Sequence, residues 1–282
     1  MTGNNALSSP LLQRMPSRAS RASQMVNLTR ELAVTSFKLR YAGSVLGYVW
    51  SLMKPLMIFG MIYLVFAVFL LRGKTNPLEN FPVQLLIGIV VYSFFAEATG
   101  TSLSSVVANS DMVKKAYFPR WILVLAATLS AAMTLAVNFV LMLSIGIPLH
   151  WYHVSLQTVI LPLLFMEVLL LALGAGLLLS ALYVYFRDLG HIWEVVLQFL
   201  FFTSMVIFPF SLIPPNYQVI VMLNPLAQVI EDLRRALVSP IIPWSADVVG
   251  ARILIPILLV IAALGVGVLA FNRLSRRFGE RL

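Results

Sequence analysis

The sequence contains no cysteine and few charged residues. Of its 282 residues, 11% are charged and 60% are hydrophobic, and the mean hydropathy is +0.92. Soluble domains carry roughly 25% charged residues, so this composition excludes an ordinary water-soluble protein and predicts a chain that lies in a membrane. The absence of cysteine excludes disulfide bonds, thiolate metal sites and a cysteine nucleophile.

The sequence also lacks a complete phosphate-binding loop. Gly73-Lys74-Thr75 matches the end of that motif, but Val68 occupies the position of its first glycine. We therefore expect that the chain does not hydrolyse ATP and is not itself an enzyme. His150 and His153 have no third ligand beside them, so we expect no metal site.

Six apolar segments are each long enough to cross a bilayer, which needs about 20 helical residues. The sequence therefore predicts an all-α integral membrane protein with six transmembrane helices. The predicted spans are residues 50–71, 81–108, 121–147, 154–186, 192–213 and 253–272.

The residues before the first span divide into a tail and a helix. Residues 1–25 are polar and basic, which predicts a disordered cytoplasmic tail, and residues 26–282 form one transmembrane domain. Within that domain, we predict that Val26–Tyr41 forms an amphipathic helix in the plane of the membrane surface, with Leu28, Leu32 and Leu39 on one stripe.

The distribution of Lys and Arg predicts the orientation of the chain. With both termini in the cytoplasm, fifteen of the 20 Lys and Arg residues lie on the inner side, as membrane proteins prefer. This places the charged island Asn109–Trp121, between the second and third spans, on the inner face. We expect a multi-pass protein of the bacterial cytoplasmic (inner) membrane.

Residues 216–238, between the fifth and sixth spans, are too short to cross the bilayer. Asn224 can cap a helix that has Pro225 at its first position. Two short helices that dip in from the outer face are expected, since unpaired backbone cannot face lipid. The alternative is an ordinary helix at the membrane interface. Their polar side would carry Glu231, Asp232, Arg234 and Arg235, with Glu231 and Arg235 spaced to form an i,i+4 pair.

Four short motifs in this order resemble the membrane subunit of type-2 ABC exporters, the polysaccharide and O-antigen export permeases. They are Lys-Lys-x-x-Phe-Pro-Arg at 114–120, Phe-Arg-Asp-Leu at 186–189, Phe-Pro at 208–209 and Leu-Asn-Pro at 223–225. The resemblance covers about residues 26–282 and is greatest to actinobacterial, mycobacterial-type galactan exporters. It implies a permease that moves a polyprenyl-diphosphate-linked polysaccharide from the cytoplasm to the exterior.

The resemblance also implies partners and roles for individual residues. The working unit would be a homodimer of this chain with two copies of a separate cytoplasmic ATPase, which binds ATP and Mg²⁺, while this chain binds no cofactor. Residues implied to contact the ATPase are Asp111, Lys114, Lys115, Tyr117, Phe118, Arg120, Arg187 and Asp188. The surface helix would contribute Leu28, Glu31, Leu32 and Lys38 to holding it. The outer gate would include Pro209, Asn224 and Pro225.

Aromatic residues on the spans are candidates for the channel wall, since flat aromatic faces bind sugars. The candidates are Tyr63, Phe66, Tyr92, Phe95, Phe199 and Phe202. The alternative for each ring is packing in the core or against lipid.

Two other function classes fit part of the sequence. An ion-coupled secondary transporter would use Glu167 or Glu97, because a carboxylate within a span is costly and indicates function. A membrane enzyme acting on polyprenyl phosphates would need clustered polar groups, for which Arg187, Asp188 and His191 are the candidates.

Overall fold

The computed structural model describes residues 18–41, 49–66, 80–115, 119–152 and 155–281, and these residues form helices and their connections without any strand. In chain order, the first elements are α1 (Arg18–Tyr41), α2 (Val49–Val65), α3 (Phe81–Ala108), α4 (Ser110–Lys115), α5 (Trp121–Gly146), η2 (Leu156–Ile160) and α6 (Leu161–Tyr183). They are followed by α7 (Leu189–Thr203), η3 (Phe210–Leu212), α8 (Pro215–Met222), α9 (Pro225–Leu237), α10 (Ser245–Val249), η4 (Gly250–Ile253), α11 (Leu254–Leu274), η5 (Ser275–Arg277) and α12 (Phe278–Arg281).

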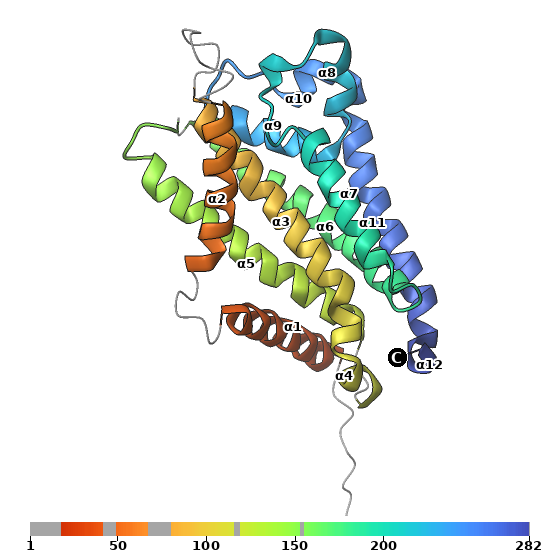
Figure 1. Ribbon diagram of the computed structural model, residues 1–282. Helices are drawn as coiled ribbons and strands as arrows, with labels where there is room; N and C mark the ends of the chain where they lie inside the picture. Colours follow the sequence, from red (N-terminus) through yellow and green to blue (C-terminus); the bar gives the residue numbers. More distant parts are fainter. Residues whose placement is uncertain (1–17, 42–48, 67–79, 116–118, 153–154, 282) are drawn as a thin grey trace, which may run out of the picture.

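The described helices form a bundle around α3 (Figure 1). In its most apolar stretch 72% of α3 is buried, against 17% for the helix that contains α11. Helix α1 lies crosswise beneath the bundle, and α8, α9 and α10 gather at the opposite end. We call the end with α1 and α4 the inner end and the end with α9 the outer end.

Within the described residues, four helices are long and apolar enough to cross a membrane, at residues 81–108, 121–146, 156–183 and 245–277. These candidate helices coincide with the second, third, fourth and sixth predicted spans. The first and fifth predicted spans correspond to shorter apolar helices. Helix α2 has 17 residues, and the remainder of that predicted span lies largely outside the described residues. Helix α7 has 15 residues and ends at Thr203, and the residues from there to Pro209 are not helical.

Helix α7 is shorter than the sequence predicted because its backbone turns at its outer end. Met205 has a positive φ of 56°, and Pro209 offers no backbone N–H to continue a helix. Fifteen residues span roughly 22 Å, which is less than the ~30 Å hydrocarbon core. The carbonyls that follow Thr203 therefore need partners from elsewhere in the protein.

Helix α1 packs across α5, and it begins at Arg18 rather than at Val26. Thr29 and Ala33 are buried on its packed side. Leu39 is 67% exposed and does not belong to that side, although the sequence placed it on the same stripe as Leu28 and Leu32.

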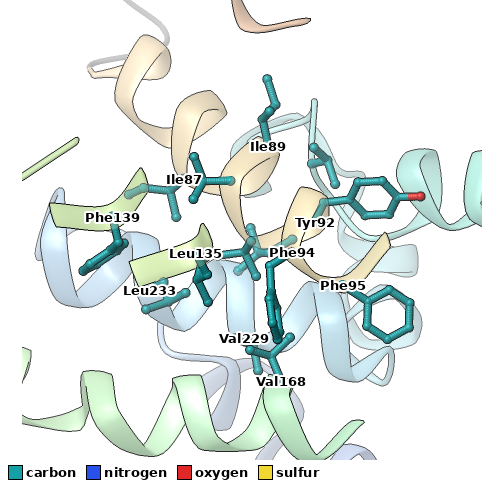
Figure 2. Packing of buried hydrophobic residues seen from close by; sticks show 14 of the residues in the cluster. Ile87, Ile89, Tyr92, Phe94, Phe95, Leu135, Phe139, Val168, Val229 and Leu233 are labelled. Atoms are coloured by element: carbon teal, nitrogen blue, oxygen red, sulfur yellow. The ribbon is translucent and has the colours of Figure 1, made fainter. Parts of the chain in front are cut away.

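The main core lies where α3, α5, α6 and α9 meet (Figure 2). Phe94 of α3, Leu135 of α5, Val168 of α6 and Val229 of α9 are buried there. This core positions the outer helix α9 directly against the spanning helices.

Helix α11 packs most closely on α6, and the two backbones touch through glycine. A Cβ atom on Gly267 would lie 2.2 Å from the carbonyl oxygen of Gly174. Small residues allow membrane helices to approach in this way and to gain van der Waals contact, because apolar lipid gives little other reason to associate.

Candidate functional site

A cavity of about 1160 Å³ opens between α2, α3, α5 and α7, with the last turn of α1 at its inner end. Its lining comprises Arg40, Trp50, Lys54, Pro55, Met57, Ile58, Met61, Ile62, Val90, Tyr92, Ser93, Phe94, Ala96, Glu97, Thr101, Thr134, Leu135, Asn138, Leu197, Gln198, Phe201 and Phe202. The volume is at or above the range of pockets that hold small ligands. It is therefore large enough for one or more sugar-sized groups.

The charged side chains of the cavity gather toward its inner end. Arg40, from the last turn of α1, forms an ion pair with Glu97 of α3. The hydroxyl of Thr134 on α5 donates to the same carboxylate at 3.2 Å. Lys54 of α2 adds a second cation to the lining. Glu97 thus ties the surface helix to two spanning helices.

The middle of the cavity is aromatic and apolar. Tyr92 donates its hydroxyl hydrogen to the carbonyl of Leu197, and its ring lies edge-on to Phe201 at a centroid distance of 5.1 Å. Phe201 and Phe202 are also edge-on to each other, at 5.6 Å. Because the Tyr92 hydroxyl is hydrogen-bonded to α7, this wall of the cavity offers a ligand mainly aromatic ring surface.

The structure brings two of the six predicted channel aromatics to the cavity, Tyr92 and Phe202. Tyr63 stacks on Phe59 outside the cavity lining. Phe66 is buried at 8% exposure, against Phe81. The other two predicted rings do not line the cavity: Phe95 packs against Trp193, and Phe199 is 68% exposed.

Sequence reasoning missed several residues of the cavity. Met57 and Met61 lie one turn apart on α2 and line it, and Phe201 lines it beside Phe202. Helical spacing on α2 could have found the methionine pair. No local signal indicates that Arg40 reaches Glu97, because the two residues belong to different helices, α1 and α3, that are far apart in the sequence.

Helix α4, which carries the predicted coupling residue Asp111, lies at the inner end of the bundle (Figure 1). Asp111 is exposed on α4. The side chains of Lys114 and Lys115, and the whole of Tyr117 and Phe118, lie outside the described residues. Arg120 directly precedes α5, and its guanidinium contacts the segment after α11.

The second predicted inner contact follows α6. Arg187 and Asp188 are both exposed, and the guanidinium of Arg187 lies 5.4 Å from the ring centroid of Tyr183. On α1, Glu31 and Lys38 are exposed. Leu28 and Leu32 are partly buried.

Most of the polar face of α9 is buried inside the protein, which the sequence did not indicate. Arg234 and Glu231 are 0% exposed and form an ion pair at 3.2 Å, so the predicted pair of Glu231 with Arg235 is wrong. Burial raises the pKa of Glu231, and the neighbouring Arg234 partly opposes that shift. The physical reason for the burial is the broken end of α7, whose carbonyls need donors.

The guanidinium of Arg234 supplies those donors. Its Nη2 donates to the carbonyl of Val206 at 3.0 Å, its Nη1 to that of Phe208 at 3.3 Å, and its Nε to that of Gln84 at 3.0 Å. Gly88 makes the approach feasible, since a Cβ atom there would lie 2.7 Å from the Val206 oxygen. One side chain therefore satisfies three backbone acceptors on two segments.

The predicted outer-gate residues lie beside this cluster. The side chain of Asn224 accepts a hydrogen bond from the backbone N–H of Leu226, which confirms the predicted cap of α9 with Pro225 at its start. The Asn224 amide also donates to the hydroxyl of Ser204 at 3.0 Å. Pro209 is buried at the start of η3. Asn224 thus joins the end of α7 to the beginning of α9.

Glu167 faces α9 and does not line the cavity. Gln228 donates to Glu167 at 3.3 Å and to Asp232 at 3.2 Å, and so lies between the two carboxyl groups. Asp232 accepts two further hydrogen bonds from the backbone and hydroxyl of Ser245. His191 is exposed and lies 3.9 Å from Glu194. Across the described ranges, no three His, Cys, Asp or Glu residues are grouped to hold a metal ion.

Comparison with known proteins identifies the family of this chain. Residues 27–238 match the family described as ABC-2 type transporter. The O-antigen export system permease protein RfbA of Klebsiella pneumoniae is 28% identical over 251 residues, covering 87% of this chain and 91% of that protein. RfbA of Myxococcus xanthus is 28% identical over 67% of this chain and 75% of that protein. The polysialic acid transport protein KpsM of Escherichia coli is 26% identical over 73% of this chain and 79% of that protein.

Proposed function

Because this chain belongs to the ABC-2 type transporter family, we propose that it is the membrane subunit of a polysaccharide exporter. The relatives reported above carry names that refer to O-antigen and polysialic acid, and both are polysaccharides. The proposed substrate is a polyprenyl-diphosphate-linked glycan that moves from the cytoplasm to the exterior. A galactan is the finer proposal, which rests on the resemblance of the sequence alone.

The cavity is the observation that carries this proposal. It combines ring surfaces at Tyr92, Phe201 and Phe202 with polar groups at its inner end. A glycan presents apolar ring faces and many hydroxyls, so it needs both kinds of surface along its path. The two cations Arg40 and Lys54 lie where the lipid diphosphate would be attracted, since phosphate groups pair with Arg and Lys.

The energy source in this proposal is a separate cytoplasmic ATPase, in two copies, that binds ATP and Mg²⁺. Helix α4 would be the part of this chain that enters the ATPase surface, with Arg187 and Asp188 as a second contact. Two copies of this chain would enclose the path between them. Both termini, α1 and α4 would then lie in the cytoplasm, with α2 and α7 as the first and fifth of six crossings and α8 and α9 dipping in from outside.

The ion-coupled alternative makes a different prediction about energy. Glu97 lines the cavity but is paired with Arg40, and Glu167 is turned toward α9. An ion-coupled transporter would continue to export when ATP is depleted. The ATPase-driven exporter would stop, and an ATPase would purify together with this chain from its native host. A membrane enzyme would instead alter polyprenyl phosphate in the absence of any transport.

The cavity assignment is tested by comparing two phenylalanines on α7. Phe202 lines the cavity and is 60% exposed, whereas Phe199, one turn earlier, is 68% exposed and does not line it. Because both side chains are exposed, replacing either with alanine should leave folding largely intact. We expect Phe202→Ala to slow glycan export several-fold at unchanged protein level, as measured in proteoliposomes with the ATPase. Equal rates for Phe202→Ala and wild type, or a greater loss in Phe199→Ala, would contradict the assignment.

A further inference from the structure

The segment after α11 turns back into the protein although it is strongly basic. Arg276 and Arg277 of this segment are exposed, but the next residue, Phe278, is 0% exposed. The preference of Lys and Arg for the inner side accounts for the arginines. That preference does not explain why a fully buried aromatic ring stands beside these arginines. The burial of Phe278 therefore indicates that other residues pack around the ring and hold it in place.

One partner of the segment is Arg120, which lies between α4 and α5. Its guanidinium lies 5.8 Å from the ring centroid of Phe278, within the range of a cation–π interaction. Its Nη1 also donates a hydrogen bond to the carbonyl of Ser275. Carbonyls at the end of a helix carry partial negative charge, which favours a cation there. Arg120 therefore contacts the segment in two independent ways.

The other partner is Tyr185, which follows α6 and precedes Arg187 in the second inner connection. Its hydroxyl donates to the carbonyl of Leu274 at 3.0 Å, and its ring lies 6.4 Å from that of Phe278. Leu274 and Ser275 are consecutive residues. Two connections far apart in the sequence thus bind adjacent carbonyls and share one aromatic ring.

The apolar cluster around Phe278 extends this junction to the rest of the inner end. Phe271 lies edge-on to Phe278 at 5.7 Å, and both belong to a cluster with Val106 of α3, Val124 of α5 and Ala181 of α6. Leu32 of the surface helix α1 packs against the same cluster. The ring of Phe278 is the point where these helices and the segment after α11 meet.

We propose that Leu274, Ser275 and Phe278 form an inner buttress that holds the connection at Arg120 and the connection at Tyr185 as one rigid unit. A push that reaches Arg120 is then passed together to α5, α6 and α11. These three residues and the two that bind them are positioning residues, since none of them lines the cavity. That the push comes from an ATPase rests on the proposed function, but the rigidity of the unit does not.

The rigidity can be measured directly because the chain has no cysteine. Spin labels on Asp111→Cys and Asp188→Cys, both at exposed positions, report the distance between the two connections in the full chain in nanodiscs. Labelled chain diluted with unlabelled chain removes distances between copies. We expect a narrow distance distribution in the otherwise unaltered protein and at least a doubled width in Tyr185→Phe and in Arg120→Gln.

Matched variants separate this role from general damage. Tyr183→Phe also removes one hydroxyl near the end of α6 but keeps the ring beneath Arg187, and it should leave the distribution narrow. Arg120→Lys keeps the charge but loses the planar fork, so its width should lie between those of wild type and Arg120→Gln. Phe278→Ala empties a buried site, so its folding is checked first and the conclusion does not depend on it.

The transport assay then tests the consequence. In complexes that assemble with the ATPase normally, Tyr185→Phe should raise the ATP hydrolysed per glycan exported by about twofold to tenfold, the factor that one lost hydrogen bond represents. The double variant of Tyr185→Phe with Arg120→Gln should add less than the sum of the single effects, because both act on one unit. An unchanged distance distribution in both single variants, or an unchanged ratio when the distribution has broadened, overturns the proposal. If wild type shows no ATP-dependent export, the proposed function fails while the distance measurement still decides on the buttress.

Discussion

Replacing Arg234 with methionine should destabilise the protein more than the same change at its neighbour Arg235. Methionine has a similar length and keeps the packing, but it removes every hydrogen bond of the guanidinium. The loss removes the guanidinium donor from the carbonyls of Gln84, Val206 and Phe208. It also leaves the buried carboxylate of Glu231 without its cation. Because the site is 0% exposed, water does not replace the missing donors.

The magnitude follows from the number of groups that lose a partner. Hydrogen bonds between membrane helices average about 0.6 kcal/mol, which sets a lower limit near ~2 kcal/mol for the four bonds of Arg234. An unpaired buried carboxylate alone costs about 3–5 kcal/mol, and orphaned carbonyls add to it. We expect a loss of about 4 kcal/mol, a large part of a total folding stability of about 5–15 kcal/mol.

The assay is thermal unfolding of the detergent-solubilised chain, followed by size-exclusion chromatography with fluorescence detection. A loss of about 4 kcal/mol corresponds to a fall in Tm of roughly 8–16 °C for a chain of this size. Arg235→Met is the control, since its guanidinium lies over the ring of Trp244 at 5.7 Å, a contact that contributes about 0.5–1 kcal/mol. We expect its Tm to fall by less than about 4 °C.

A second variant tests the reasoning about charge. Adding Glu231→Gln to Arg234→Met removes the unpaired carboxylate, so the double variant should recover part of the lost Tm. If Arg234→Met and Arg235→Met unfold at similar temperatures, or if the double variant is less stable than Arg234→Met alone, the guanidinium does not hold the broken end of α7 as described.

Two further predictions concern the outer cluster and the inner connection. Burial raises the pKa of Asp232 above its unfolded value, although hydrogen bonds from Ser245 and Gln228 partly oppose the shift. The folded state then binds the proton more tightly than the unfolded state, so stability falls as the pH rises through the folded pKa. Asp232→Asn should therefore raise Tm at neutral pH and reduce the fall in Tm as the pH rises above the unfolded aspartate pKa of about 4, and an unaltered pH profile would contradict the argument. Replacing both Lys114 and Lys115 with glutamate should separate ATP hydrolysis from export while the chain still inserts in the membrane, and unchanged export would count against a coupling role for α4.

The Arg40–Glu97 contact is an example of a tertiary contact that this sequence does not predict. Arg40 belongs to a surface helix and Glu97 to a span, and nothing near either residue in the sequence indicates the other. The sequence marks Glu97 only as a candidate functional position, because burying a carboxylate within a span is costly. The identity of its partner depended on how α1 lies across the bundle, which is set by packing of small residues such as Ala33 on α5.

One physical reason explains why the sequence does not show which of the predicted aromatics reach the cavity. Tyr92 and Phe202 reach the cavity, whereas Phe66 and Phe95 are buried in the core and Phe199 is exposed without lining the cavity. In a soluble protein the polar side of a helix reveals which side is buried. In a membrane helix both the lipid-facing side and the core side are apolar, so the spacing of phenylalanines does not distinguish a core side from a lipid-facing side or a cavity wall.

The sequence by itself determined the class of protein, most of the helices and several of their ends. Its low charge required a bilayer, its apolar runs had the length of spans, and Asn224-Pro225 fixed the start of α9 through local hydrogen bonding and a preset φ. Only the tertiary structure decided that the polar face of α9 is buried, that Arg234 binds the carbonyls after α7, and that Phe278 joins two distant connections. These contacts are determined by which broken or ending helices lie within reach of a donor, and that depends on the packed arrangement of the whole bundle.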